Sequence, residues 1–295
     1  MSPPSPPRWS RRRMLAATGV LPLLACERRA SPASAHDGSL RIASQTVLAD
    51  EVLWDLGPSV RAHVVAVSPM ADDPRYSRVV DRWPAPIPRA AGTSDALLAL
   101  APTLVILASF TAAETRTLLE HAGLRTLVLE RFDGFDDYRA NVRAIAAAVE
   151  TPAAAEHVIA AFDERLATLR LHPTERPRVV SWNEGSVPAA GTTFDDVATA
   201  AGYRNLPAEQ GRHGHLQISV EQLVAWDPDV LVVPCDAERC PETTAEIAAR
   251  PGLRATRAAR DGMVIGVPSR DLYSTGAGML DTLARLRAAH PEAAS

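Results

Sequence analysis

The sequence is short of the features that mark several common classes of protein. Aromatic residues make up only 5% of the 295 residues. Apart from an N-terminal stretch, no apolar run approaches the roughly 20 residues that a membrane-spanning helix needs. Positive charge is not in excess either, since the formal net charge is -4 at pH 7. We therefore expect a globular chain that does not bind nucleic acid.

Motifs of common catalytic sites are missing as well. The chain has no Gly-x-Ser-x-Gly elbow, no His-Glu-x-x-His, no phosphate-binding loop and no Gly-x-Gly-x-x-Gly. Two carboxylate pairs occur, Asp72-Asp73 and Asp195-Asp196, but residues adjacent in sequence do not form an acid–base pair. We expect no enzymatic activity and no intrinsic cofactor. An exported hydrolase is the alternative, which turnover of an ester or phosphate would support.

Cysteine is scarce, with three residues in the whole chain. Two of them, Cys235 and Cys240, end the segment Cys-Asp-Ala-Glu-Arg-Cys. In an oxidising compartment such a pair is expected to form a disulfide. Free thiols and half of a zinc site are the alternatives, although no further Cys or His lies close by in sequence.

The N-terminus has the pattern of an export signal. Arg11–Arg13 precede an apolar run over Leu15–Ala25, whose last residues and Cys26 spell Leu-Leu-Ala-Cys. This order is typical of a twin-arginine signal peptide that ends in a lipobox, and an ordinary secretory signal is the alternative route. We expect residues 1–25 to be removed, Cys26 to carry lipid, and residues 26–39 to form a flexible tether. The protein is then periplasmic and anchored to a membrane by lipid.

From Leu40 onward, short apolar runs alternate with longer segments of helical periodicity, which predicts mostly parallel sheets covered by helices on both faces. Strands are predicted at 40–43, 63–67, 104–107, 126–129, 179–182, 230–233 and 263–267. Helices are predicted at 48–56, 94–100, 111–122, 136–149, 152–169, 194–201, 219–226, 243–249 and 277–289, with loop over 68–91.

Two similar segments indicate two similar lobes. Residues 97–107 and 223–233 share the order helix, proline-bearing turn and buried strand. Between them, Thr151 and Pro152 are the N-cap and first residue of a long helix. The predicted fold is α/β, with two Rossmann-like α/β lobes of mostly parallel sheets joined by a single long α-helix and a ligand between the lobes. The predicted boundaries are an N-terminal lobe at 40–150, the interlobe helix at 151–171 and a C-terminal lobe at 172–295.

Several motifs occur in an order that matches one family. They are a strand-loop-helix at 44–57, a strand at 64–68, a Gly-helix-strand signature at 91–106, and second-lobe motifs at 201–205 and 218–230. Together they cover essentially the whole chain after the signal. The chain resembles the substrate-binding proteins of ATP-binding-cassette (ABC) importers for cobalamin, iron-siderophores and haem, whose two α/β lobes are joined by one long helix. It departs from them at Thr103, usually aspartate, and at 274–278, often a Pro- and Arg-containing turn.

The resemblance implies that one exposed glutamate on each lobe docks into arginines of the membrane permease. Glu51 and Glu221 occupy the matching positions. Two separated negative charges fix the orientation of a partner and speed its encounter. The alternative at both positions is a solvated carboxylate in the first turn of a helix.

Loops after the predicted strands hold the candidate ligand-binding residues. Aromatic rings offer flat apolar faces to a macrocycle or catecholate, and arginines can pair with carboxylates. For Phe110 and Trp182 the alternative is a place in the core. His213 and His215 invite a metal site, but no third ligand lies nearby, so we expect none. The candidates are Met70, Arg75, Tyr76, Trp83, Phe110, Trp182, Arg212, His215, Arg270 and Tyr273.

The implied function is capture of a small-molecule metal chelate and its delivery to an ABC importer permease, whose cytoplasmic ATPase supplies the energy. The expected cargo is a cobalt or iron chelate, either cobalamin or a ferric siderophore. Haem is less favoured because Tyr and Met pairs are scarce near the expected cleft. A manganese- or zinc-binding transporter lipoprotein is the alternative. We expect a monomer that closes only slightly on its ligand.

Overall fold

The computed structural model describes residues 39–90 and 94–294. The predicted signal peptide, Cys26, nearly all of the tether and the glycine of the 91–106 motif lie outside the described residues. Within the described ranges, no helix is both long and apolar enough to cross a membrane.

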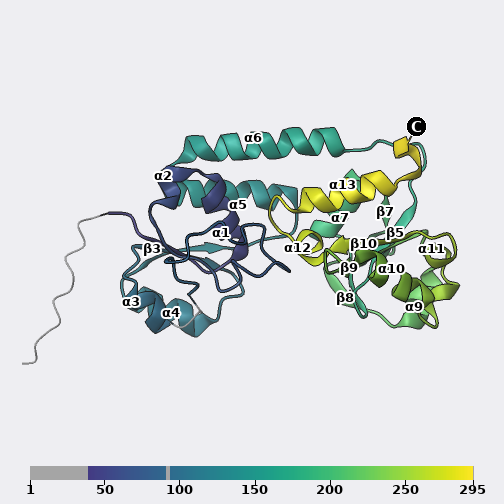
Figure 1. Cartoon of the computed structure of the whole chain (residues 1–295), viewed down its shortest axis with the longest axis horizontal. Helices are drawn as coiled ribbons and strands as arrows, with labels where there is room; N and C mark the ends of the chain where they lie inside the picture. The colour runs from purple at the N-terminus through teal and green to yellow at the C-terminus, as the bar shows by residue number, and fades with distance from the viewer. Residues whose placement is uncertain (1–38, 91–93, 295) are drawn as a thin grey trace, which may run out of the picture. The chain divides into compact units, whose positions relative to one another are not determined.

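The first half of the described chain forms a four-stranded parallel sheet in the order β2-β1-β3-β4. Strand β3 is buried at every residue, as an apolar run in a parallel sheet covered on both faces should be. The strands are β1 (Ile42–Ser44), β2 (Val64–Ala66), β3 (Leu104–Ala108) and β4 (Arg125–Leu129). The helices are α1 (Val47–Asp55), α2 (Pro58–Arg61), α3 (Ser94–Ala99), α4 (Ala113–His121) and α5 (Phe135–Ala148) (Figure 1).

The second half repeats this design with a parallel sheet in the order β10-β9-β5-β7 and adds an antiparallel β6-β8 pair. The strands are β5 (Arg178–Ser181), β6 (Ser186–Pro188), β7 (Arg204–Asn205), β8 (His215–Gln217), β9 (Val230–Cys235) and β10 (Val264–Pro268). The helices are α7 (Thr193–Ala200), α8 (Leu206–Glu209), α9 (Val220–Trp226), α10 (Cys240–Ala249), α11 (Arg257–Arg260), α12 (Ser269–Leu272) and α13 (Met279–Ala289). Short 3₁₀ turns lie at Leu253–Ala255 and Pro291–Ala294.

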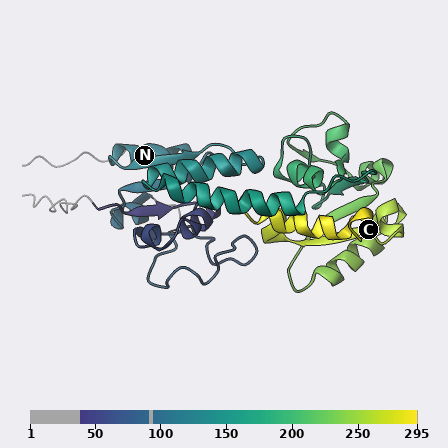
Figure 2. The same cartoon turned by 90° about the horizontal axis from the view of Figure 1, so that it is seen from above.

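Helix α6 (Pro152–Leu169) connects the two halves. Its 18 residues span roughly 27 Å at 1.5 Å per residue. Ala155, Ile159, Phe162 and Leu166 are buried at the spacing of one helical face. This face packs on α5 of the N-terminal lobe and on α13 of the C-terminal lobe, and Figure 2 shows α6 running beside both.

One hydrophobic core runs through both lobes, and a smaller core lies on the other side of each sheet. In β3, Leu104 and Ile106 belong to the shared core, while Val105 faces the smaller one. In β9, Val232 belongs to the shared core and Leu231 to the other. This alternation is the period of two of a β-strand. A core shared by both lobes favours small relative movements, since wide opening would expose it to water.

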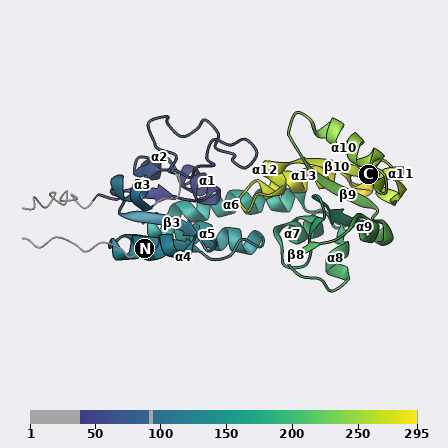
Figure 3. The same cartoon turned by 90° about the horizontal axis from the view of Figure 1, so that it is seen from below.

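The predicted two-lobe α/β fold is confirmed, and the predicted long helix at 152–169 has the observed bounds. Segment 68–90 is a long loop made mostly of turns, visible in dark blue beside α1 in Figure 3. Helix α2 was not predicted, because the proline taken as a stop begins it as its first helical residue. The other unpredicted elements have two to four residues each, which is too short for a periodic pattern.

Candidate functional site

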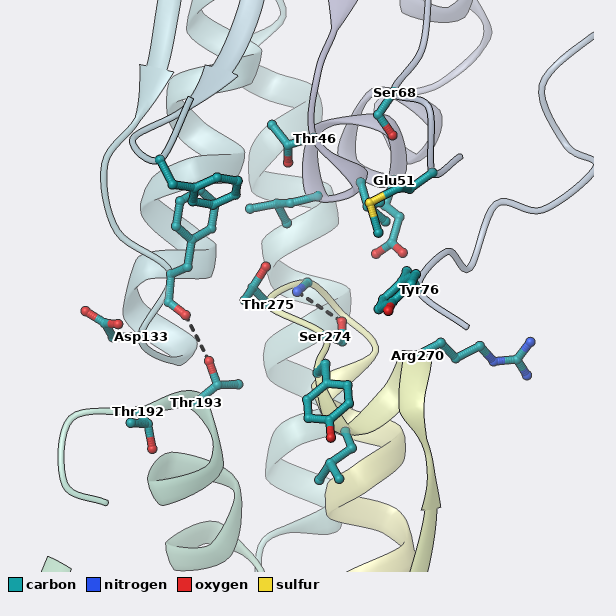
Figure 4. Close-up of a pocket in the computed structure, with 18 of the residues that line it drawn as sticks. Thr46, Glu51, Ser68, Tyr76, Asp133, Thr192, Thr193, Arg270, Ser274 and Thr275 are labelled. Atoms are coloured by element: carbon teal, nitrogen blue, oxygen red, sulfur yellow. Dashed lines mark hydrogen bonds between the residues drawn. The ribbon is translucent and has the colours of Figure 1, made fainter. Parts of the chain in front are cut away.

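A cavity of about 850 Å³ opens where loops of the two lobes face each other (Figure 4). In the N-terminal lobe its lining comes from the segments that follow β1, β2, β3 and β4. In the C-terminal lobe it comes from the segments after β5, β6 and β10, the start of α7, and His215 of β8. The carboxyl ends of parallel strands meet at one edge of each sheet, so the direction of the strands brings these loops together.

The apolar wall of the cavity is built by two rings from neighbouring loops. Phe110 follows β3 and Phe132 follows β4, with their ring centroids 5.8 Å apart. Phe110 is 80% exposed, which is unusual for a large apolar side chain. An exposed ring held at a cavity by a second ring is well placed to stack on a flat ligand.

Two tyrosine rings, one from each lobe, also line the cavity. Tyr76 comes from the coil after β2, and Tyr273 directly follows α12. Burial, and then the nearby Tyr76, raise the pKa of Tyr273 to about 12. Its phenol is therefore protonated and neutral at physiological pH.

Glu51 lies at the floor of the cavity, on α1, and only 7% of it is exposed. Its Oε1 accepts the main-chain N–H of Arg78 at 3.1 Å. Burial raises the pKa of the Glu51 carboxyl to about 7, although the hydrogen bond and the charge of Arg78 oppose the shift. A carboxyl in this position cannot reach a docking partner, which corrects the expectation that Glu51 is an exposed docking residue.

Arg78 also ties the two lobes together beneath the cavity. Its guanidinium Nη1 lies 3.1 Å from Oδ1 of Asp271 on α12 and contacts Asp281 on α13. Arg165 of α6 contacts the other oxygen of Asp281. This ion cluster joins the coil after β2 to three helices.

The lobes also meet on another side of the cavity. Thr193 Oγ1, at the start of α7, donates to the main-chain oxygen of Phe132 at 2.9 Å. Close by, the main-chain N–H of Phe135 donates to Oδ2 of Asp196 at 2.9 Å. These bonds and the Arg78 cluster place the two walls of the cavity relative to each other.

The structure brings six of the ten candidate ligand residues into the cavity lining and places four elsewhere. Trp83 and Trp182, each 2% exposed, lie in the core. Trp83 packs edge-to-face on Trp54 at 5.2 Å, and Trp182 belongs to the smaller core of the C-terminal lobe. The lining residues are Met70, Tyr76, Phe110, His215, Arg270 and Tyr273.

The remaining two candidates, Arg75 and Arg212, are exposed side chains outside this lining. Arg75 pairs with Asp73 at 2.7 Å and lies over the ring of Tyr76 at 5.4 Å. It therefore supports a lining residue from outside the cavity.

Several lining residues were not among the candidates. Phe132 follows a strand, so the rule that found Phe110 could also have found it. Ser274 and Thr275 belong to the turn that departs from the family pattern. Glu51 had been assigned to the surface, since no pattern in one sequence shows which face of a short helix turns inward.

The two cysteines of the C-terminal lobe, Cys235 at the end of β9 and Cys240 at the start of α10, form a disulfide. His213 and His215 are both exposed. Among the described residues, no three His, Cys, Asp or Glu side chains come together as a metal site.

Glu221 is exposed in the first turn of α9, as expected for a docking residue. A hydrogen bond with the Ser219 hydroxyl lowers the pKa of its carboxyl, so it is ionised at neutral pH. The match between residues 97–107 and 223–233 aligns Glu221 with Asp95. Asp95 is likewise exposed in the first turn of α3, which leads into β3 as α9 leads into β9.

Solved structures of several bacterial binding proteins share this fold. The haem-binding protein RhuT of Roseiflexus has a TM-score of 0.72 and 25% identity over 88% of this chain and 100% of its own. A haem-binding protein of Pseudomonas aeruginosa has a TM-score of 0.68 and 26% identity over 84% of this chain and 91% of its own. HutB of Vibrio cholerae, also haem-binding, has a TM-score of 0.69 and 21% identity over 84% and 98%.

No curated protein matches the chain. The family model described as periplasmic binding protein matches residues 43–270, from β1 to α12. That match spans most of the chain and both sheets. The chain belongs to the periplasmic binding protein family.

Proposed function

We propose that this protein captures a metal chelate in the cavity between its lobes and delivers it to an ABC importer, and that haem is the first candidate cargo. The observation that carries the proposal is the cavity itself. It has about 850 Å³, it is lined by loops of both lobes, and Phe110 stands 80% exposed at its wall. Large, mostly apolar cavities with a few polar groups are typical of sites for bulky ligands.

Two findings support haem over the other chelates. The relatives from Roseiflexus and Pseudomonas aeruginosa, at 25% and 26% identity, are haem-binding proteins. Tyr and Met pairs were expected to be scarce near the cleft, which disfavoured haem, yet Met70, Tyr76 and Tyr273 all line the cavity. Tyr273 and His215 offer an oxygen and a nitrogen donor that can complete the coordination of a haem iron.

Cobalamin and ferric siderophores form the second cargo class. The lining also contains hydroxyl and amide groups, including Thr46, Asn183 and Thr192. Such groups suit the amides of cobalamin or the oxygen atoms of a siderophore, because they can both donate and accept hydrogen bonds, although the Thr192 hydroxyl is already bonded to Ala189 and Asp195.

A ligand screen of the purified protein by thermal shift and tryptophan quenching tests the proposal. The panel contains haem, cobalamin, several ferric siderophores, manganese and zinc. Saturable stabilisation by one chelate supports capture and names the cargo, because a ligand that binds only the folded state must stabilise it. A response to manganese or zinc alone would favour a metal-ion transporter and make His213 and His215 the first residues to replace. If no compound of the panel changed the melting temperature or the tryptophan fluorescence, chelate capture would be contradicted.

We further propose that Glu221 and Asp95 are the two docking carboxylates. Both are exposed, both lie in the first turn of the helix before a central strand, and they correspond in the internal repeat. Asp95 replaces the buried Glu51 as the docking candidate of the N-terminal lobe. Exposed charges of this kind add modest affinity but orient the partner.

Export and lipid attachment complete the proposal. The twin arginines, the short apolar run and the Leu-Leu-Ala-Cys sequence support a lipoprotein held at a membrane by Cys26. A Cys26→Ser variant should appear in the soluble periplasmic fraction while the unchanged chain stays with membranes. Equal partitioning of the two would contradict the lipid anchor.

A further inference from the structure

Glu51 carries an oxygen that faces the cavity without a protein partner. Its Oε1 is occupied by the N–H of Arg78. For Oε2, no hydrogen bond is found among the residues that the structure describes, although Glu51 as a whole is more than nine-tenths buried and lines the cavity. Among the described residues, Oε2 is not one of the buried side-chain atoms that lack a partner. It is therefore accessible from the cavity and can form a hydrogen bond with a ligand there.

The opposite lobe approaches this carboxyl closely. A Cβ placed on Gly276, in the cavity-lining turn after α12, would lie 2.8 Å from Oε2 of Glu51. That turn is held in shape by the main-chain N–H of Gly276, which donates to Ser274 Oγ at 3.1 Å. Oε2 therefore lies close to this turn, and Figure 4 shows Glu51 with Ser274 and Thr275 of the turn.

The charged surroundings of Glu51 come from five elements. Arg78 is the one cation among the groups that act on it, and two carboxylates of its own helix oppose its ionisation. The titratable and charged groups that face Glu51, directly or through Arg78, are Asp50 and Asp55 of α1, Arg78 of the coil after β2, Tyr138 of α5, Asp271 of α12 and Asp281 of α13. Since Arg78 is shared with Asp271 and Asp281, its charge is not free to balance a fully ionised Glu51.

The same side of the cavity holds an attachment point for an anion. Arg270 is the arginine of the described lining. Asp271 lies between it and Arg78, with Oδ1 3.7 Å from Nε of Arg270 and 3.1 Å from Nη1 of Arg78, and the main-chain N–H of Arg78 binds Glu51. Figure 4 shows the Arg270 side chain extending away from Glu51, while the turn that contains Ser274 lies nearer to it. An acidic group of the cargo at the Ser274 turn would lie close to Glu51.

We propose that Glu51 takes up a proton when an anionic chelate enters the cavity, so that capture is coupled to protonation and weakens as the pH rises. This inference rests on the proposed function. It adds that the cargo is anionic and that Glu51 is the residue that responds to its charge. The neutral carboxyl donates its O–H to a carboxylate of the cargo. The proton comes from solvent and no covalent bond to the protein forms.

The protonation balance of the free protein fits this role. Burial raises the pKa of Glu51 to about 7, so the neutral and ionised forms are both populated near neutrality. A ligand carboxylate beside it raises the pKa further, because like charges disfavour ionisation. Affinity should then be constant below the pKa of the free protein and fall above it.

Affinity for iron(III) protoporphyrin, a dicarboxylate, measured between pH 6 and pH 8 tests the inference. The dissociation constant of the unchanged protein should rise about tenfold over this range, the factor for a group of pKa 7 that must be protonated in the complex. Glu51→Gln keeps the acceptor for Arg78. Its dissociation constant should change with pH only as far as ionisation of the porphyrin itself requires. Glu120→Gln, an exposed residue of α4 outside the lining, should follow the unchanged protein. Equal slopes for the unchanged protein and E51Q, or tighter binding at high pH, would overturn the inference.

Calorimetry of the unchanged protein gives a second test that does not depend on the folding of any variant. Titrations at pH 7.5 in two buffers with different ionisation enthalpies report the protons exchanged on binding. Net uptake supports the inference, and no exchange or net release overturns it. If neither the porphyrin nor any other chelate binds at any pH, the proposed function itself fails and this inference fails with it. Tight binding that does not depend on pH would overturn only this inference and would leave the proposed function standing.

Discussion

Arg78 of the N-terminal lobe pairs with Asp271 of the C-terminal lobe, with 3.1 Å between Nη1 and Oδ1. The Asp271 side chain is only 8% exposed. Because the main-chain N–H of the same arginine binds Glu51 at the cavity floor, one residue joins the contact between the lobes to the ligand cavity. The expected small closure is consistent with such a link, since wide separation would break this pair.

Replacing Arg78 should destabilise the protein because it removes the cation that Asp271 and Asp281 share between the lobes. Arg78→Gln is expected to lower the free energy of unfolding by about 1–3 kcal/mol, the usual cost of an unsatisfied buried polar or charged group. Urea denaturation at pH 7 measures the change. Arg75→Gln is the matched control, since its pair with Asp73 is exposed, and its unfolding midpoint should stay close to that of the unchanged protein. A stable R78Q variant would show that the ion cluster is not needed for stability.

Phe110 should contribute to ligand affinity and not to stability. Its ring is 80% exposed in the free protein, so Phe110→Ala removes little buried area on folding. Burying such a ring under a ligand contributes on the order of 1.5–3 kcal/mol, and the dissociation constant of the chelate should therefore rise at least tenfold. Leu118→Ala, an exposed apolar residue of α4 outside the lining, should leave affinity unchanged. Equal affinities for F110A and the unchanged protein would exclude stacking on this ring.

The fold followed from the sequence because its signals are long and repeated. The apolar run at 104–107 and its counterpart at 230–233 are buried strands that pattern alone identifies. The helix at 152–169 has a clear start at Pro152 and one buried face. The short elements after β5 and β10 gave no such signal, and these segments supply much of the cavity wall.

The site was predictable only as a set of loops. The rule that ligands bind after the carboxyl ends of parallel strands placed Phe110 and Tyr273 correctly at the cavity. It did not distinguish rings that point into the cavity from rings that fill the core, because Trp182 follows a strand just as Phe110 does. Glu51 was misplaced for a related reason: its inward direction depends on Arg78 and Gly276, which are distant in sequence.

The docking carboxylates should be needed for transport and not for binding. Asp95→Arg combined with Glu221→Arg should abolish cargo-dependent uptake, because two exposed negative charges become positive and repel the arginines that the permease is expected to offer. Chelate affinity of the purified double variant should be unchanged. Glu114→Arg, an exposed acidic residue in the first turn of α4, is the control and should retain uptake. Normal uptake by the double variant would exclude this docking surface.

The disulfide should raise the free energy of unfolding by a modest amount, because the loop that it closes is short. Cys235 and Cys240 are five residues apart, and closing so short a loop in the unfolded chain is worth roughly 2 kcal/mol. The double variant Cys235→Ser, Cys240→Ser should lose about that amount in urea denaturation, and a reducing agent should have the same effect on the unchanged protein. Insensitivity of the unchanged protein to reductant, with full reduction verified by thiol titration, would contradict this estimate.

Glu51 should make stability depend on pH even without a ligand. The pKa of an unperturbed glutamate is near 4.5, and burial raises the pKa of Glu51 to about 7 in the folded protein. The folded state therefore binds the proton more tightly than the unfolded state, so the associated stability is present below pH 4.5 and is lost as the pH rises through 7. Glu51→Gln stays neutral at all pH values and should be more stable than the unchanged protein at pH 8 by up to roughly 3 kcal/mol. At pH 5 the difference should shrink to about 1 kcal/mol or less, because Glu51 is protonated in the folded protein and only partly ionised in the unfolded one. Urea denaturation of both proteins at pH 5 and pH 8 measures the difference. Parallel pH profiles for the two proteins would mean that Glu51 is ionised throughout this range and that the buried carboxyl does not respond to proton concentration.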